Sequence, residues 1–415
     1  SQLTKTYTEK YKDYRQALEL FDKEKYSAAH EKFSKVILQI DNQQDEIQVS
    51  SEYLYAVCAL NLFHQDAQYL LSQFAINHPD SPKTKKIFFL LGNDYFRKKK
   101  WKKTIEWFEK VDVYDLSADE KTEFYFKKGN SYFNEEEFAK AKTAFYKIKD
   151  DKSSDYYAPT QYYYSHISYQ DENYQTALVG FRNIEKNPSF SPIVPYYIAQ
   201  ILFKQEKYKE VIAYIPAILN GDRVKREAEI QGILGSSYFK LEDYKNAIPY
   251  LKYYFSKTPK KSIDNYYQLG YSYYKVEDHK NAIKHLGRVA SRNTERAQIV
   301  NYLLAESYIK TDNKKYAKSA FKRAYELGLN SKISEDALFG YAKTTYELTY
   351  NPYDEATGIF HKFLDEYPKS NKKEQVYEYL LDVYTTTKNY KAALESINRI
   401  NEKNFKIKEA HQKLS

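Results

Sequence analysis

The residue types that most often carry out chemistry are present in this chain, but their spacing does not bring them together. The eight histidines include no H-E-x-x-H pair, and the two nearest, His279 and His285, are six residues apart and share no helix face. The single cysteine, Cys58, has no neighbouring histidine or basic cluster to activate it, which predicts a core residue rather than a nucleophile. We therefore expect no catalytic residues, no metal site and no cofactor.

One charged motif could contact nucleic acid or an anionic surface. Residues 97–103 contain six basic side chains in seven positions. The run falls in an expected turn between two helices, where a solvated charged loop is ordinary, and residues 134–137 form an acidic counterpart. The net charge of +9 is spread along the chain, so we expect no nucleic-acid partner.

The composition indicates which elements must position these side chains. The chain of 415 residues has 46 Tyr, 23 Phe and 2 Trp but only 11 Gly and 11 Pro, which favours helices packed on helices. The longest apolar runs, such as residues 87–91, are far shorter than the roughly 20 residues that cross a bilayer, so we expect no membrane span. Because the first residue is Ser1 rather than Met, we expect either that a targeting segment has been removed or that the start reflects recombinant expression.

A two-helix pattern recurs along the whole chain. A clear copy has Leu234-Gly235 and Tyr238 in its first helix and Ala247 and Leu251 in its second. A small residue of the second helix, which we call the anchor, recurs every 34 to 39 residues and is alanine in nine of eleven copies. The anchors are Ala29, Ala67, Thr104, Ala141, Ala177, Val211, Ala247, Ala282, Ala317, Ala356 and Ala393.

This pattern resembles the tetratricopeptide repeat (TPR) family, whose signature is W-x2-L-G-x2-Y in a first helix and A-x3-F in a second. The resemblance covers nearly all of the chain and implies an all-α fold, a right-handed α-solenoid of stacked helix-turn-helix repeats. Close packing of the two helices requires small residues, so we expect the first-helix glycines to face the anchors, and bulky residues to fill the space between pairs. These glycines are Gly92, Gly129, Gly235 and Gly270.

Repeat 6 departs most from the pattern. Its anchor is Val211, and Pro216 inside the second helix removes a backbone hydrogen bond and should bend the axis. We therefore predict an N-terminal stack of repeats 1–6 over residues 1–220 and a C-terminal stack of repeats 7–11 over residues 221–404. Residues 405–415 are expected to form the first helix of a further, incomplete repeat.

The resemblance implies that positions 2, 5, 9 and 12 of each first helix line a concave groove. In this chain positions 5 and 12 are mostly aromatic and share one helix face, while position 9 between them is mostly polar. Such a face suits an extended peptide or a partner helix, although the same aromatics also suit packing between repeats. The candidate partner-binding residues are Phe89, Asn93, Phe126, Asn130, Tyr162, His166, Tyr196, Tyr267, Tyr271, Tyr302 and Phe339.

Three functions follow as alternatives. The first is a non-catalytic protein–protein interaction scaffold, an accessory or structural subunit of a larger cell-envelope assembly that is outer-membrane or secretion-associated. The Tyr-, Lys- and Asn-rich texture is similar to cell-envelope repeat proteins of Bacteroidota-type bacteria, which implies a periplasmic location and association with a membrane complex; the alternative location is cytoplasmic.

The second is a peptide-binding, co-chaperone-like adaptor. Phe89 and Phe126 argue against it, because they stand where the carboxylate clamp of such proteins needs cations. The third is an RNA-binding helical-repeat protein, which is disfavoured because the ninth positions vary too freely for a one-base-per-repeat code.

Overall fold

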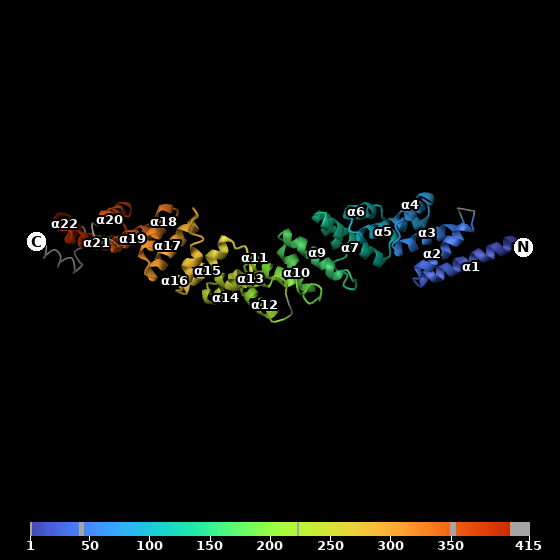
Figure 1. Ribbon diagram of the computed structural model, residues 1–415, viewed down its shortest axis with the longest axis horizontal. Helices are drawn as coiled ribbons and strands as arrows, with labels where there is room; N and C mark the ends of the chain where they lie inside the picture. Colours follow the sequence, from blue (N-terminus) through green and yellow to red (C-terminus); the bar gives the residue numbers. More distant parts are fainter. Residues whose placement is uncertain (1, 41–44, 222–223, 349–353, 399–415) are drawn as a thin grey trace. The chain divides into compact units, whose positions relative to one another are not determined.

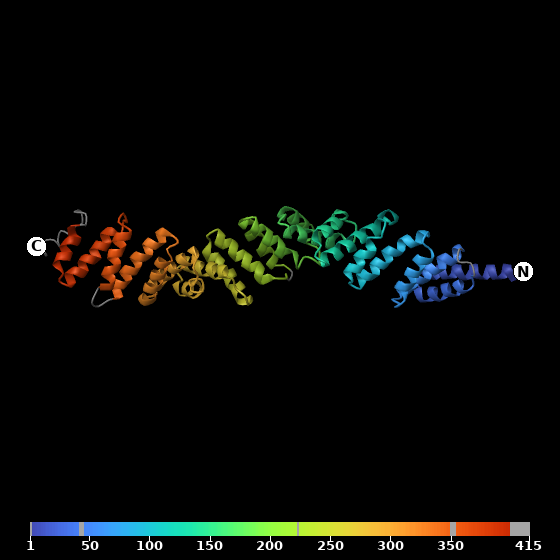
Figure 2. The ribbon, with the colours of Figure 1, turned by 90° about the horizontal axis from the view of Figure 1, so that it is seen from above.

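The computed structural model describes residues 2–40, 45–221, 224–348 and 354–398, and in these ranges it contains helices but no strand. The helices follow one another as eleven helix–turn–helix pairs, in the chain order shown in Figure 1 and, from above, in Figure 2. From α1 to α10 and from α12 to α22 each helix packs against the next along the chain, and several first helices of neighbouring pairs also touch, such as α17 and α19. The predicted all-α solenoid of stacked helix pairs is confirmed.

Contacts between residues divide the chain into two units, residues 1–201 and 202–415. The first unit contains α1 (Gln2–Asp22), α2 (Tyr26–Leu38), α3 (Glu46–Asn61), α4 (Ala67–Asn77), α5 (Pro82–Arg97), α6 (Trp101–Phe108), the 3-10 helix η1 (Val113–Asp115), α7 (Ala118–Asn134), α8 (Phe138–Tyr146), α9 (Tyr157–Gln170) and α10 (Tyr174–Ile184). The division falls within α11 (Val194–Lys204).

The second unit continues with α12 (Tyr208–Leu219), α13 (Glu227–Lys240), α14 (Tyr244–Lys257), α15 (Ile263–Lys275), α16 (His279–Leu286), α17 (Glu295–Lys310), α18 (Lys314–Leu327), α19 (Ser331–Leu348), α20 (Asp354–Glu366), α21 (Lys373–Thr386) and α22 (Tyr390–Asn398). Pro216 lies inside α12. Contact density does not locate a hinge, so the stack boundary predicted after residue 220 stays a prediction. The incomplete repeat predicted at 405–415 lies outside the described residues.

The eleven anchors lie in the core, as their spacing predicted. Every anchor side chain is at most 3% exposed. The core is made of clusters that each join neighbouring pairs; for example, Phe33 of α2 lies in one cluster with Cys58 of α3. Each pair therefore buries its apolar surface only with its neighbours present, which makes stability a shared property of the array.

The first-helix glycines contact a different residue from the one we predicted. A Cβ added to Gly92 would lie 2.2 Å from the ring of Phe108, and one added to Gly235 would lie 2.9 Å from both the Cγ and the backbone nitrogen of Leu251. These partners stand four residues after the anchor, one turn further along the second helix. The prediction that the glycine faces the anchor itself was wrong. The small anchor lets the second helix approach the first, and the glycine makes room for the bulky residue that follows the anchor by one turn.

The turn inside each pair uses a left-handed residue that is not glycine. In the turn after α13, Glu242 has φ 59°, and the Asp243 N–H donates to the Tyr238 carbonyl at 2.9 Å, which closes a Schellman motif. Ten turns share this feature, with φ from 54° to 62°; the turn of the tenth pair lies outside the described residues. The left-handed residues are Glu24, Phe63, Lys99, Glu136, Glu172, Glu206, Glu242, Glu277, Asp312 and Lys388.

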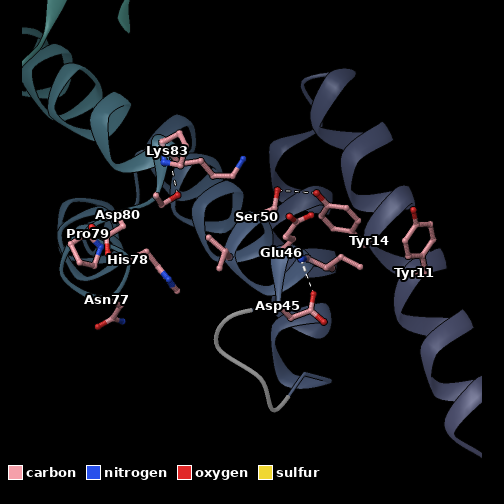
Figure 3. Close-up of a pocket in the computed structure, with 14 residues that line it drawn as sticks. Tyr11, Tyr14, Asp45, Glu46, Ser50, Asn77, His78, Pro79, Asp80 and Lys83 are labelled. Atoms are coloured by element: carbon pink, nitrogen blue, oxygen red, sulfur yellow. Dashed lines mark hydrogen bonds between the residues drawn. The ribbon is translucent and has the colours of Figure 1, made fainter.

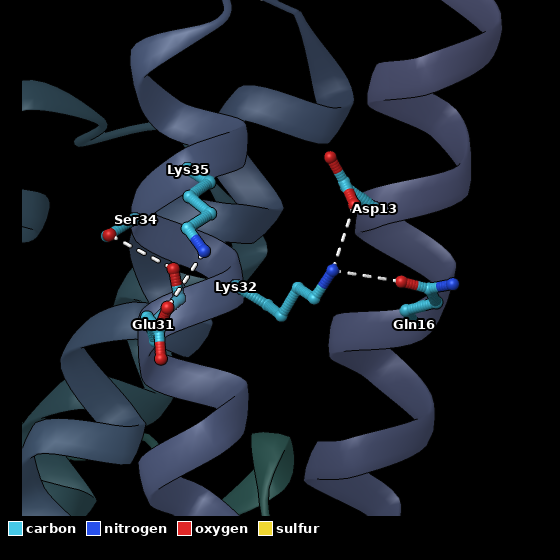
Figure 4. A network of polar contacts seen from close by, with 6 residues as sticks. All are labelled: Asp13, Gln16, Glu31, Lys32, Ser34 and Lys35. Carbon is cyan, nitrogen blue, oxygen red and sulfur yellow. Dashed lines mark hydrogen bonds and ion pairs between the residues drawn. The ribbon is translucent and has the colours of Figure 1, made fainter.

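Polar contacts add to the packing of the first pair. Lys32 of α2 donates to Asp13 and Gln16 of α1 at 3.1 and 3.0 Å, across the helix–helix contact (Figure 4). On the outer side of α2, Lys35 and Glu31 form an exposed i,i+4 pair at 2.8 Å. The first contact fixes how α2 lies on α1, whereas the second contributes little because both groups are solvated.

The glycine contacts predict opposite results for two leucine substitutions. Gly235→Leu should destabilise the protein by about 1–3 kcal/mol, because the side chain would overlap Leu251 and its backbone. Gly358→Leu, in the interior of α20 with nothing within 4 Å of an added Cβ, should stabilise it by up to about 1 kcal/mol. Urea unfolding measures both; a Gly235→Leu midpoint equal to wild type would contradict the close approach.

The left-handed turns predict a stabilising substitution. Glu242→Gly should raise the free energy of unfolding by about 0.5 kcal/mol, because relief of the left-handed conformation exceeds the added chain entropy. Lys252→Gly, at an exposed site in the interior of α14, should instead lower it by about 1 kcal/mol. Loss of stability in both variants would show that Glu242 makes a contribution beyond backbone geometry.

Candidate interaction face

The candidate partner-binding residues fall into two groups by burial. Phe89 and Asn130 are 4% and 7% exposed, so their side chains serve the packing of their own unit. The other nine are half-buried, with part of each side chain open to solvent. Whether these nine contact a partner stays a prediction, and their neighbours show which of them are already occupied.

In the first unit the candidate rings pack on one another. Phe126 stacks on Tyr156 with 4.7 Å between ring centroids, and Tyr162 stacks on Phe190 at 5.2 Å. His166 lies edge-on to Tyr197 at 5.5 Å, and burial lowers its pKa, which favours the neutral imidazole. In this unit the aromatic positions mainly bridge neighbouring pairs.

Repeat positions are counted so that the first-helix glycine, such as Gly270, is position 8. At three steps in the described part of the chain, position 12 of one pair donates a hydrogen bond to position 9 of the next, and we call these bonds the hydroxyl ladder. The Tyr169 hydroxyl at position 12 of α9 donates to Gln200 at position 9 of α11, at 2.8 Å. In the second unit, Tyr274 of α15 donates in the same way to Glu306 of α17, and Tyr346 of α19 to Asp382 of α21. These ninth-position groups are therefore occupied by the preceding pair rather than free for a partner.

Burial reinforces the ladder. Removal of the Tyr169 hydroxyl from solvent raises its pKa to about 12. Burial raises the pKa of Tyr274 as well, and the Glu306 carboxylate adds to the effect. Because a phenol with a raised pKa keeps its proton throughout the neutral range, these hydroxyls remain donors.

Steps where position 12 is phenylalanine, such as Phe239, have no such bond, and neither does the step from α17 to α19, which lies between the two bonds of the second unit. Position 12 of α17 is Ile309, which has no hydroxyl, and position 9 of α19 is Lys343, a cation. A hollow of about 350 Å³ lies here, and its lining includes both residues. Tyr302 and Phe339, two of the candidate residues, also line it, so the structure brings these two together at this step.

The aromatic rings that line the hollow pack against neighbouring rings. Tyr302 lies edge-on to Phe321 at 5.7 Å between ring centroids, and Phe339 packs on Phe363 at 5.8 Å. Ile309 is 37% exposed and stands beside these rings in the lining. The hollow therefore presents fixed rings and one open aliphatic side chain.

The charges of the hollow are unequally paired. Its three carboxylates have partners: Glu306 accepts from Tyr274, Asp336 pairs with Lys372, and Glu347 pairs with Lys314 at 2.9 Å. By contrast, in the part of the chain that the structure describes, no carboxylate lies at ion-pair distance from the cations Lys310 and Lys343. Lys343 stands at position 9, which the sequence shows to be mostly polar, but that it lacks an acceptor is visible only in the structure.

The first unit has a larger but less distinctive hollow, shown in Figure 3. It has a volume of about 880 Å³ and lies among α1, α3 and the loop before α5. Its polar groups are used by the fold: Tyr14 donates to Ser50 at 2.8 Å, and Asp45 accepts from the N–H of Ile47 at the start of α3. Because these polar groups already have partners within the fold, few of them remain to bind a ligand.

The charged run at 97–103 is tied into the fold. Arg97 and Lys98 donate to Asp94, whose side chain is 1% exposed. Burial alone would raise the pKa of Asp94, but hydrogen bonds from Lys98, Gln68 and Arg97 together lower it. Lys102 and Lys103 lie within ion-pair distance of acidic residues, so most of the run is paired rather than presented as a free basic patch.

The residues considered for chemistry behave as structural groups. Cys58 is buried, and burial raises the pKa of its thiol to about 12, as expected for a core residue. In the part of the chain that the structure describes, no three His, Cys, Asp or Glu side chains gather in a way that could hold a metal ion. No helix in the same part is long and apolar enough to cross a membrane.

These observations define a helical-repeat protein built of stacked helix pairs. Family models agree: residues 228–252 and 263–295 match one model described as tetratricopeptide repeat, and residues 336–370 match a second. These matches support the tetratricopeptide repeat family that the spacing of the anchors indicated. No curated protein matches it in sequence.

Several solved structures are similar to the chain. YrrB, a TPR protein with an unusual peptide-binding site, is 17% identical over 47% of this chain and 97% of YrrB, with a TM-score of 0.39. The C-terminal part of a TPR repeat-containing protein from Cytophaga hutchinsonii is 19% identical over 60% of this chain and 98% of its own, with a TM-score of 0.39. The complex of Naa15/Naa10 bound to HypK-THB gives 10% identity over 98% of this chain and 66% of its own, with a TM-score of 0.42.

The hydroxyl ladder predicts that removal of one tyrosine hydroxyl lowers the free energy of unfolding. Tyr274→Phe should lower the free energy of unfolding by about 1–2 kcal/mol, because it removes a bond to the charged Glu306 between two pairs. Tyr316→Phe, at a 64% exposed ring of α18, is the matched control and should change it by less than about 0.5 kcal/mol. Equal unfolding midpoints for the two variants would show that the ladder contributes nothing to stability.

Proposed function

We propose that this protein is a non-catalytic scaffold that binds protein partners along the first-helix face of its second unit. The observation that carries the proposal is the hollow between α17 and α19, where supported aromatic rings, an exposed isoleucine and unpaired cations meet. Rigid aromatic side chains supply contact area at low entropic cost, which is typical of protein-binding surfaces.

The placement of the residues considered for chemistry supports the non-catalytic part of the proposal. The histidines are scattered in sequence, and Cys58 is buried with a raised thiol pKa. A stack of helix pairs also presents an extended surface to which many pairs contribute, and this suits simultaneous contact with an extended partner.

We further propose that the partners belong to a cell-envelope assembly, outer-membrane or secretion-associated, with the protein in the periplasm. The composition supports this part of the proposal: Tyr, Lys and Asn are abundant, and all but one of the ten anchor spacings exceed the 34-residue TPR period.

The test is affinity capture of the tagged chain from its host after crosslinking, with mass spectrometry of the captured proteins. The triple variant Tyr267→Ala, Tyr302→Ala and Phe339→Ala should lose at least about nine-tenths of the wild-type partner signal, a loss equivalent to about 1.4 kcal/mol. Its thermal midpoint should fall by less than that of Gly235→Leu, because the three side chains are only half-buried.

The matched control is the triple variant Tyr69→Ala, Tyr114→Ala and Tyr316→Ala, which removes three well-exposed rings from other faces and should capture partners as wild type does. Loss of capture in the control, or retention in the first variant, would contradict the proposed face. Recovery of cytoplasmic proteins alone would contradict the envelope location and leave the scaffold role in place.

A further inference from the structure

We infer that the hollow between α17 and α19 binds an acidic segment of a partner protein, with an apolar partner side chain on Ile309 and Phe339 and partner carboxylates on Lys343 and Lys310. This inference rests on the proposed function and adds the chemistry of the partner. It follows from three properties of the hollow: its unpaired charge, its open apolar wall and its place in the hydroxyl ladder.

The ion pairs of the hollow favour carboxylates, because two of its cations, Lys310 and Lys343, lack an ion pair within the described residues. In the same residues only Glu306 among its carboxylates lacks one, its donor Tyr274 being neutral. Glu306, Asp336 and Glu347 are each already held by a residue of this unit. A cationic partner segment would have to displace those contacts, whereas an anionic one finds Lys310 and Lys343 without a carboxylate in the described part of the chain. Electrostatic complementarity of this kind determines partner choice and association rate more than total affinity.

The apolar wall requires that the segment also carry a hydrophobic residue. Ile309 is 37% exposed beside Phe339, whose other side packs on Phe363. Burial of one aliphatic side chain on such a wall contributes binding that salt does not screen. Lys372 lies 5.6 Å from the centroid of the Phe339 ring, which further fixes that ring in the lining.

The ladder explains why this step of the second unit differs from those beside it. At the step before, Tyr274 and Glu306 bond to each other, and at the step after, Tyr346 and Asp382 do so. Ile309 and Lys343 replace a hydroxyl donor and an acceptor with an apolar group and a cation, which cannot bond to each other. A carboxylate and an apolar side chain from a partner would satisfy the two groups left at this step.

Three fluorescent 12-residue probes test the inference by anisotropy with the full chain at low salt. They repeat Leu-Asp-Glu, Leu-Asn-Gln and Leu-Lys-Arg, which differ in charge but keep the same apolar residue. We expect saturable binding of the acidic probe, at least about tenfold tighter than the neutral one and weakened further by salt. The basic probe should bind most weakly of the three.

Charge-matched variants locate the binding. Lys343→Glu should raise the acidic-probe Kd at least about tenfold, whereas Lys315→Glu, an exposed lysine of α18 outside the hollow, should change it less than about twofold. Ile309→Ser should weaken the acidic and neutral probes alike, and Leu241→Ser, similarly exposed at the end of α13, should weaken neither.

Each other outcome overturns the inference. Equal binding of acidic and neutral probes that Ile309→Ser abolishes would keep the binding face and reject the acidic partner. Tighter binding of the basic probe, or equal effects of Lys343→Glu and Lys315→Glu, would reject the assigned charge contacts. No saturable binding of any probe at millimolar protein would reject the hollow as a binding site, whereas the capture experiment would still judge the wider scaffold role.

Discussion

The structure depends on one close approach that four of the helix pairs share: a glycine, which has no Cβ, in the first helix contacts a phenylalanine or a leucine of the second. At Gly92 the neighbour is Phe108, and at Gly235 it is Leu251. The buried anchor one turn earlier keeps the second helix close enough for that contact. Because the same bulky residues also reach the next pair, as Phe108 does on Phe124, one contact both closes a pair and begins the next.

If the helix pairs stacked identically, their first-helix face would have no preferred position for a partner. The hydrogen bonds between pairs make some positions on this face different from others. Where position 12 is tyrosine and position 9 of the next pair is an acceptor, the two bond and the face is closed to a ligand. Between Ile309 and Lys343 they do not, and the hollow lies there. The step at Phe239 also lacks the bond, so the hollow, the exposed Ile309 and the cation Lys343 distinguish the step from α17 to α19. In this account the binding position is a step without the bond that stabilises the steps beside it.

The sequence predicted the helices and the anchors well, because a small residue at a nearly constant spacing constrains both helix phase and pair packing. It did not predict the left-handed turns, since Glu242 and its equivalents lack the glycine that usually marks them. It placed Gly235 against the wrong residue, because periodicity gives a helix face but not the height along the axis at which two faces meet. Tyr302 and Phe339 were predicted for the face, but the unpaired state of Lys343 depends on which neighbours reach it and required the structure.

The most direct test of this account is to restore the missing step of the ladder. The double variant Ile309→Tyr and Lys343→Glu copies the Tyr274–Glu306 pair of the step before, and the measurement is partner capture beside urea unfolding. We predict that the variant unfolds at the same or a higher urea concentration than wild type and no longer captures its partner. Undiminished capture by a stably folded double variant would contradict the claim that the step without the bond forms the binding site.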